Sequence, residues 1–182
     1  MIYIFTGNGK GKTTAALGQA MRAVGEGKRV LMVQFIKGPW KSGEDEIKII
    51  PPENQKSGKF KLVKMGKGFV GILGDSLPRS EHEKAAREAL DLVKKETASG
   101  NWDIIILDEI NNAVSLNLIS KDAVLRLINL RPTAYGLEPV TFVLTGRDAP
   151  QEFIDVADLV TEMREVKHQF TQGTKGKRGL EY

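Results

Sequence analysis

Short apolar runs alternate with segments of helical character along most of this chain. Runs of strand type occupy residues 1–5, 28–36, 60–65, 102–109, 139–145 and 159–163. Between them, apolar side chains recur at helical spacing in residues 15–24, 80–99, 120–130 and 150–157. Several of the strand-type runs are apolar almost throughout, which is typical of parallel strands covered by helices on both faces. The alternation predicts an α/β fold, a three-layer sandwich with a mostly parallel central sheet.

Two of the predicted helices carry boundary signals. Ser80 is followed three residues later by Glu83, which is the spacing of a capping box, so we expect Ser80 to be the N-cap. His82 then falls in the first turn, where polar side chains are usually solvated, so we expect an exposed imidazole. The later helix at residues 120–130 should end at Arg131-Pro132, because proline cannot continue it.

Residues 37–59 follow neither period. Gly38-Pro39 and Pro51-Pro52 interrupt any regular element, and we expect at most one helical turn, near residues 45–47. A connection of this length inside a compact domain is more often functional than idle. We therefore expect it to take part in function.

A glycine-rich turn, Thr6-Gly7-Asn8-Gly9-Lys10-Gly11-Lys12-Thr13-Thr14, joins the first predicted strand to the first helix. Such a turn directs backbone N–H groups to one spot, and the helix N-terminus adds partial positive charge, so the segment favours a phosphate chain. The usual phosphate-loop spacing would begin at Thr6, not at a glycine: either the loop is one residue tighter and starts at Gly7, or Thr6 takes the first position. We expect Lys12 to reach the phosphates and the Thr13 hydroxyl to hold Mg²⁺. The nucleotide-binding set is then Gly7, Asn8, Gly9, Lys10, Gly11, Lys12, Thr13 and Thr14.

Two acidic residues end the predicted strand at residues 102–109. Four aliphatic residues precede Asp108 and Glu109, which places both carboxylates at the carboxyl end of a buried strand, where ligands of open parallel sheets bind. In phosphate-loop proteins an acidic residue there approaches Mg²⁺ directly or through water. Arg147 follows another strand and is well placed at the same edge to neutralise phosphate. These features predict a P-loop NTPase-like sandwich of the RecA type, in a single domain spanning residues 1–182.

Composition narrows the chemistry. The chain has no cysteine, which excludes disulfides, thiolate catalysis and cysteine-ligated zinc or iron–sulfur clusters. The formal net charge is +4, with basic segments at residues 37–67 and 164–182. These segments could serve an anionic ligand or nucleic acid, but solvated loops account for most such runs. Because no charged-then-apolar leader precedes the first strand and no apolar run approaches about 18 residues, we expect a cytoplasmic protein with no membrane partner.

Five blocks of sequence carry a resemblance to a known family. They are residues 7–14 (GNGKGKTT), residues 33–44 (VQFIKG, then Trp40 and Gly43-Glu44), residues 107–111 (LDEIN), residues 144–147 (LTGR), and residues 157–182 (ADLVTEM, VKH and GLEY). In this order they resemble the ATP:corrinoid adenosyltransferases of the phosphate-loop type, over nearly the whole chain. The shortened phosphate loop is similar to the family's own form.

The resemblance implies that Co(I) of a reduced corrinoid attacks the 5′ carbon of ATP and expels triphosphate, in adenosylcobalamin biosynthesis and salvage. It implies ATP with its phosphate chain reversed relative to ordinary NTPases, Mg²⁺ on Thr13 and Glu109, and phosphate contacts from Arg22 and Arg147. It also implies a homodimer and a reductant such as a flavodoxin or reduced flavin, with no role for nucleic acid. The catalytic set that follows is Lys12, Thr13, Glu109 and Phe69.

Phe69 belongs to Gly66-Lys67-Gly68-Phe69, which resembles the family segment that removes the lower axial ligand of cobalt and makes Co(II) easier to reduce. The resemblance implies that Phe69 fills the space below the corrin; otherwise it is an ordinary core aromatic. Relatives often have a tryptophan two residues after this phenylalanine, and here that position holds Gly71.

Two other functions stay open from the sequence. A RecA-like P-loop ATPase acting on nucleic acid would use the same loop and acidic strand end, with Glu109 activating water. It leaves residues 33–38, 162–163 and 167–168 unexplained except as coincidence. A nucleotide-binding regulator without turnover would need only the loop.

Overall fold

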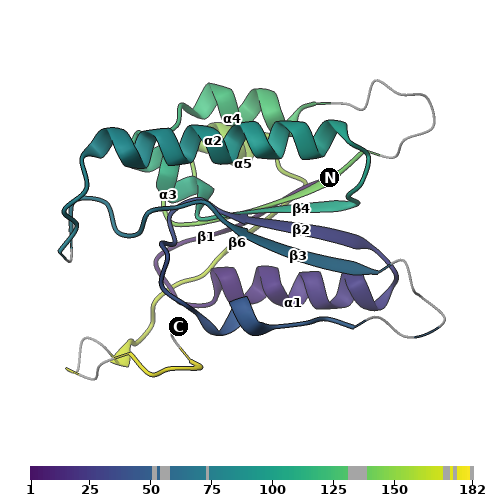
Figure 1. The fold of residues 1–182 in the computed structure, drawn as a ribbon, viewed down its shortest axis with the longest axis horizontal. Coiled ribbons are helices and arrows are strands. Elements are labelled where there is room, and N and C mark those ends of the chain that lie inside the picture. Colours follow the sequence, from purple (N-terminus) through teal and green to yellow (C-terminus); the bar gives the residue numbers. More distant parts are fainter. Residues whose placement is uncertain are drawn as a thin grey trace.

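The computed structural model describes residues 1–50, 53, 58–72, 74–130, 139–169, 173 and 176–180. Six strands form one sheet in the order β3-β2-β4-β5-β1-β6, and every neighbouring pair is parallel (Figure 1). Each strand overlaps its predicted run, so the predicted parallel sheet is confirmed. The strands are β1 (Ile2–Thr6), β2 (Arg29–Gln34), β3 (Lys59–Lys64), β4 (Ile104–Asp108), β5 (Thr141–Thr145) and β6 (Leu159–Glu162).

Helices cover both faces of the sheet (Figure 1). α1 (Lys12–Gly25) lies on one face. The other face carries α2 (Arg79–Ala98), α3 (Ile110–Ser115), α4 (Lys121–Ile128) and α5 (Gln151–Val156). This is the predicted three-layer sandwich.

Alternation along the strands divides the core into two clusters. In β2, Val30 and Met32 pack with the alanine-rich face of α1. Leu31 and Val33 point to the opposite face and join the larger cluster, to which α2, α3 and α4 contribute. All four side chains are fully buried, and burying a side chain of this size contributes about 1.5–3 kcal/mol. Burial on both faces is why this run is apolar almost throughout.

The carboxyl ends of the strands meet at one edge of the sheet, as they must when all strands are parallel. The phosphate loop follows β1, Glu109 follows β4 and Gly146 follows β5. One strand, β5, separates β1 from β4. This interposed strand is the RecA-type arrangement predicted from the sequence.

The predicted start of α2 is wrong in two respects. Pro78 occupies the N-cap position and no side chain caps the helix, so Ser80 lies inside it. His82 is 3% exposed, not solvated, and its Nε2 lies 3.0 Å from Asp75 Oδ2. The loop before α2 brings Asp75 against the imidazole, a contact that the capping pattern does not encode.

Two other helix predictions are confirmed, one cannot be assessed, and one helix was missed. Ser120 caps α4 by accepting a hydrogen bond from the Ala123 amide at 3.3 Å, and the single turn expected in the long connection is the 3-10 helix η1 (Gly43–Glu46). The predicted terminator Arg131-Pro132 lies outside the described residues. The short helix α3 was not predicted, because its six residues are too few to show a helical period.

Candidate active site

The phosphate loop is held by the chain that follows β6. The Gly9 amide donates a hydrogen bond to the Met163 carbonyl oxygen at 2.6 Å. A Cβ added at Gly7 or Gly9 would lie 2.5 Å or 2.7 Å from that same oxygen, and Gly7 also has a left-handed φ of 92°. The close approach of the Met163 backbone therefore requires glycine at both positions. This contact explains why the short loop is rich in glycine.

Lys12 points into the concavity of this loop. Its Nζ donates to the carbonyl oxygens of Gly7 at 2.8 Å and Gly9 at 2.7 Å. Burial lowers the pKa of Lys12 below its usual value, and the nearby positive charge of Arg147 lowers it further. The loop thus holds a partly desolvated ammonium group where a phosphate oxygen would gain most from it.

Asp108 is the most fully bonded acid of the site. Its Oδ1 accepts from the hydroxyls of Thr13 at 2.9 Å and Thr145 at 2.7 Å, and its Oδ2 accepts from Gln34 Nε2 at 3.0 Å. The side chain is fully buried, and Lys37 Nζ lies 3.9 Å from Oδ2. One carboxylate therefore ties α1, β2 and β5 together at the carboxyl edge of the sheet.

Glu109, by contrast, is under-bonded. Its backbone adopts the left-handed region at φ 63°, and its amide donates to Thr145 Oγ1 at 2.9 Å. Its Oε2 is buried and has no hydrogen-bond partner among the described residues. Burial and then the charge of Asp108 raise the pKa of Glu109 to about 7. A left-handed backbone and an unsatisfied buried carboxylate oxygen on the same non-glycine residue make Glu109 a candidate functional residue.

Two cavities meet at this acid. A cavity of about 480 Å³ lies beside the phosphate loop, and a second of about 360 Å³ lies beside residues 36–42. Both are lined by Lys37 and Glu109. The first is also lined by residues 10–14, Leu17, Gly43, Glu44, Ile47, Gly179 and Leu180, and the second by Ile36, Gly38, Trp40, Lys41, Ser42, Lys64, Gly68 and Phe69.

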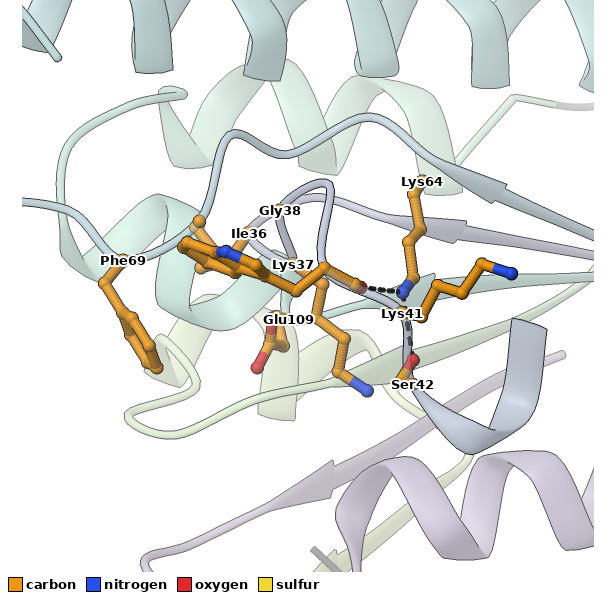
Figure 2. A pocket seen from close by; sticks show the side chains of 10 residues that line it. Ile36, Lys37, Gly38, Lys41, Ser42, Lys64, Phe69 and Glu109 are labelled. Atoms are coloured by element: carbon orange, nitrogen blue, oxygen red, sulfur yellow. Dashed lines mark hydrogen bonds between the residues drawn. The ribbon is translucent and has the colours of Figure 1, made fainter. Parts of the chain in front are cut away.

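The second cavity has an aromatic end. Figure 2 shows Phe69 at one end of its lining and Lys64 at the other, with Lys37 and Glu109 between them. The rings of Trp40 and Phe69 are 6.0 Å apart between centroids, and their residues are 62% and 47% exposed. Phe69 is therefore not a core aromatic, and its ring is available to a flat ligand.

Lys64 shapes the segment that carries Trp40. Its Nζ donates to the Trp40 carbonyl at 2.8 Å and to Ser42 Oγ at 2.9 Å (Figure 2). It also donates to Asp45 Oδ2 at 2.6 Å. Three bonds from one ammonium group fix the turn between β2 and η1, the wall that both cavities share.

Not all of the predicted residues gather at the site. Thr13, Asp108 and Glu109 do, and Arg147 lies near enough to lower the pKa of Lys12. The Arg147 side chain is exposed, and its backbone N–H donates to Asn112 Oδ1 at 3.0 Å. Arg22 lines neither cavity: it lies in the last turn of α1, about 15 Å along the helix from Lys12 by the helical rise.

Several residues at the site had no assigned role in the sequence analysis. They are Gln34, Lys37, Glu44 and Thr145, which surround Asp108, and Met163, which covers the loop. Lys37 also forms an ion pair with Glu44, whose pKa falls to about 2; burial opposes this fall, and the Lys37 hydrogen bond is the largest cause of it. A strand-end position was the available signal for Gln34, Thr145 and Met163.

The donor set suits a cation that shares its ligands with phosphate. Among the described residues, no three His, Cys, Asp or Glu side chains form a ready metal site. The Thr13 hydroxyl donates a hydrogen bond to Asp108, which leaves its oxygen lone pairs for a cation, and Glu109 Oε2 lacks a partner among the described residues. Mg²⁺ is commonly held by one or two protein oxygens with the rest from phosphates and water. The residues present therefore fit Mg²⁺ with a nucleotide.

No helix in the described part of the chain is both long enough and apolar enough to cross a membrane.

The whole chain is similar to known proteins of one family. Residues 1–182 match the family model of ATP:corrinoid adenosyltransferase BtuR/CobO/CobP. The chain is 38% identical to the corrinoid adenosyltransferase of Escherichia coli strain K12 over 182 residues, which is 100% of this chain and 85% of that protein. It is 37% identical to the corrinoid adenosyltransferase CobA of Salmonella typhimurium, again over 100% and 85%, and 35% identical to that of Pseudomonas aeruginosa, over 100% and 83%. A phosphate loop joined through one acid to an aromatic cavity, together with full-length similarity, leads to one conclusion: this chain belongs to the ATP:corrinoid adenosyltransferase family.

Proposed function

We propose that the protein transfers the 5′-deoxyadenosyl group of ATP to the cobalt of a reduced corrinoid and releases triphosphate. The electron pair of Co(I) forms the cobalt–carbon bond, the bond from C5′ to oxygen breaks, and its electrons stay on the departing triphosphate. No proton has to be removed from the nucleophile. This agrees with a chain that has no cysteine and whose buried histidine, His82, lines neither cavity.

One observation carries the proposal: the polar cavity at the phosphate loop and the aromatic cavity share Lys37 and Glu109. A hydrolase needs water at the end of a phosphate chain. A transferase of this type needs the leaving group clamped on one side while the reacting carbon faces a second, flatter ligand. Two adjoining cavities, one at the phosphate loop and the other mostly apolar, support the second arrangement.

On the polar side, the leaving group needs positive charge held in place before reaction. Lys12 and the loop amides would bind the triphosphate, and Arg147 would approach it from the β5 end. Thr13 and Glu109 would hold Mg²⁺, while Asp108 orients Thr13 by accepting a hydrogen bond from its hydroxyl. When bound, Mg²⁺ supplies further positive charge to the departing oxygen. Arg22 would need a neighbouring subunit or a moved helix to take part.

On the aromatic side, Phe69 and Trp40 would contact the corrin. An exposed phenylalanine beside a cavity is suited to fill the space below the cobalt in place of its lower ligand. Gly71 lacks the indole found in relatives, so Phe69 would do this alone. We further propose a cytoplasmic homodimer that receives electrons from a flavodoxin or reduced flavin, since Co(I) must be generated before transfer.

The direct test supplies ATP, Mg²⁺ and chemically reduced cobalamin. We expect a light-sensitive adenosylated product and triphosphate in equal amounts. Lys12→Ala and Glu109→Gln should each lower transfer by about 100-fold or more, as for loss of a preorganised charge at a leaving group, while Glu88→Gln on the exposed face of α2 serves as the control. ADP and phosphate as products, with stimulation by DNA or RNA, would instead support the RecA-like ATPase that the family assignment disfavours.

A further inference from the structure

His82 is a buried histidine that the proposed chemistry does not use. Its side chain is 2% exposed although it lies in the first turn of α2. Nε2 lies 3.0 Å from Oδ2 of Asp75, whose side chain is 8% exposed. A buried polar pair of this kind needs a reason, because each partner gives up solvation to form it.

Asp75 connects this histidine to the loop that carries Phe69. Its Oδ2 also accepts from the Gly71 amide at 2.8 Å, and its Oδ1 accepts from the Leu77 amide at 3.1 Å. These amide bonds hold the pKa of Asp75 below its usual value, the Gly71 bond most strongly, and His82 adds to the effect. The carboxylate is therefore ionised, His82 Nε2 donates to it, and hydrogen bonds to an ionised acceptor are about twice as strong as neutral ones.

Phe69 is held on its other side as well. The Gly68 amide donates to the Ile36 carbonyl at 2.9 Å, and Gly68 has a φ of 107°. A Cβ at Gly68 would lie 2.5 Å from the Trp40 ring. The backbone is thus fixed one residue before Phe69 and two residues after it, while Phe69 is 47% exposed and its side chain lines the second cavity (Figure 2).

Gly71 combines a left-handed backbone with an amide that bonds to Asp75. Its φ is 69°, a left-handed conformation that side chains rarely adopt, although a Cβ there would meet nothing within 4 Å. The conformation, and not crowding, therefore selects glycine. In this conformation the Gly71 amide donates to Asp75 Oδ2 at 2.8 Å.

We propose that His82 is a positioning residue, which acts through Asp75 to fix the backbone at Gly71 and so hold Phe69 in place beside the second cavity. This rests on the proposed function, because it gives a purpose to Phe69 only if that ring works under the corrin. A 1 Å displacement of a reacting group can lower a rate by about 100-fold, so the backbone position of Phe69 matters.

The test compares His82→Phe, which keeps a planar ring but cannot donate, with His82→Gln, which can still donate. Asp75→Ala removes the same link from the loop side, and Glu81→Gln, an exposed neighbour, is the control. Amide hydrogen exchange in peptides covering residues 68–78 is measured on the full chain without ligands. Adenosyl transfer is measured from preformed Co(I) and, separately, from Co(II) with a flavin reductant.

We expect His82→Phe and Asp75→Ala to speed exchange at the Gly71 and Leu77 amides by about tenfold. Both should lower the Co(II)-started rate at least about fivefold more than the Co(I)-started rate. His82→Gln should recover most of both effects, and Glu81→Gln should match the wild type.

Unchanged exchange in both His82→Phe and Asp75→Ala would show that the clamp formed by His82, Asp75 and Gly71 does not hold the loop. That result would overturn the proposal. Faster exchange with equal losses from Co(I) and Co(II) would also overturn it, because the loop would then be structural only. If the wild type forms no adenosylated product, the proposed function fails instead, and the exchange measurements alone decide whether the clamp exists.

Discussion

Replacing Glu109 with glutamine is expected to stabilise the protein above neutral pH while removing a group needed for transfer. In the folded chain its pKa is raised to about 7 from an ordinary 4.5, because burial and then Asp108 disfavour its charge. A carboxylate with a raised pKa must either take up a proton on folding or stay charged at a cost. Glutamine has nearly the same shape and no charge.

The size of the effect follows from the two pKa values. Between pH 4.5 and 7 the folded state holds a proton that the unfolded state has lost, so stability falls as pH rises through this window. The lost stability is about 1 kcal/mol at pH 5 and levels off at about 3 kcal/mol above pH 8. The advantage of Glu109→Gln over wild type should therefore grow by about 2 kcal/mol from pH 5 to pH 8, about 4–8 °C in Tm for a chain of this size.

The assay is urea unfolding of both proteins at pH 5 and pH 8, with chelator present and no nucleotide, and with Glu88→Gln as an exposed control. Comparing the gap between proteins at two pH values cancels any fixed effect of the glutamine amide. A gap of the same size at both pH values, or one that narrows toward pH 8, would refute the reasoning. Adding Mg²⁺ and ATP at pH 8 should then stabilise the wild type more than Glu109→Gln.

Three further predictions concern the walls of the two cavities. Lys12→Ala should leave Tm within about 2 °C of wild type, because water can replace its hydrogen bonds to the loop carbonyls. It should nevertheless lower kcat/KM about 100-fold or more. A Tm loss well beyond about 2 °C would contradict this, because the lost activity would then reflect unfolding. Gly66→Ala should destabilise by about 1–3 kcal/mol in thermal unfolding, since the new Cβ would lie 2.2 Å from the Ile36 carbonyl carbon, whereas Gly18→Ala, with open space on α1, should stabilise by about 0.5–1 kcal/mol. Lys64→Met should speed amide exchange in residues 40–46 and weaken corrinoid binding, while Lys64→Arg keeps part of both; unaltered exchange would show that the ammonium group does not anchor the turn.

The features of the candidate site whose positions could be predicted are those that depend on consecutive residues. The loop at residues 6–14 combines a strand before it and a helix after it, and Asp108 and Glu109 end an aliphatic run. Each signal is local, so the placement of both at one edge of a parallel sheet followed directly. The separate roles of the two acids did not follow, because they depend on Thr145, 37 residues away from Asp108, and Gln34, 74 residues away.

The wrong predictions for the start of α2 and for His82 also arise from contacts that a local pattern does not contain. Ser80 and Glu83 have capping-box spacing, but the chain entering α2 comes from Pro78 and brings Asp75 over the first turn. Propensity and spacing describe an isolated segment, and a loop that folds back on it changes which side chains meet water.

By itself, the sequence determined the parallel sheet, the phosphate-binding turn, the acidic strand end and the family. Hydrophobic period, glycine spacing and strand-end position are properties of neighbouring residues. Only the tertiary structure decided that Met163 lies across the loop, that Asp108 is saturated while Glu109 Oε2 is left without a partner, and that His82 is buried. These outcomes depend on contacts between segments that folding brings together, and the free energy of burying a charge is set by those contacts and not by the residue's own neighbours in the chain.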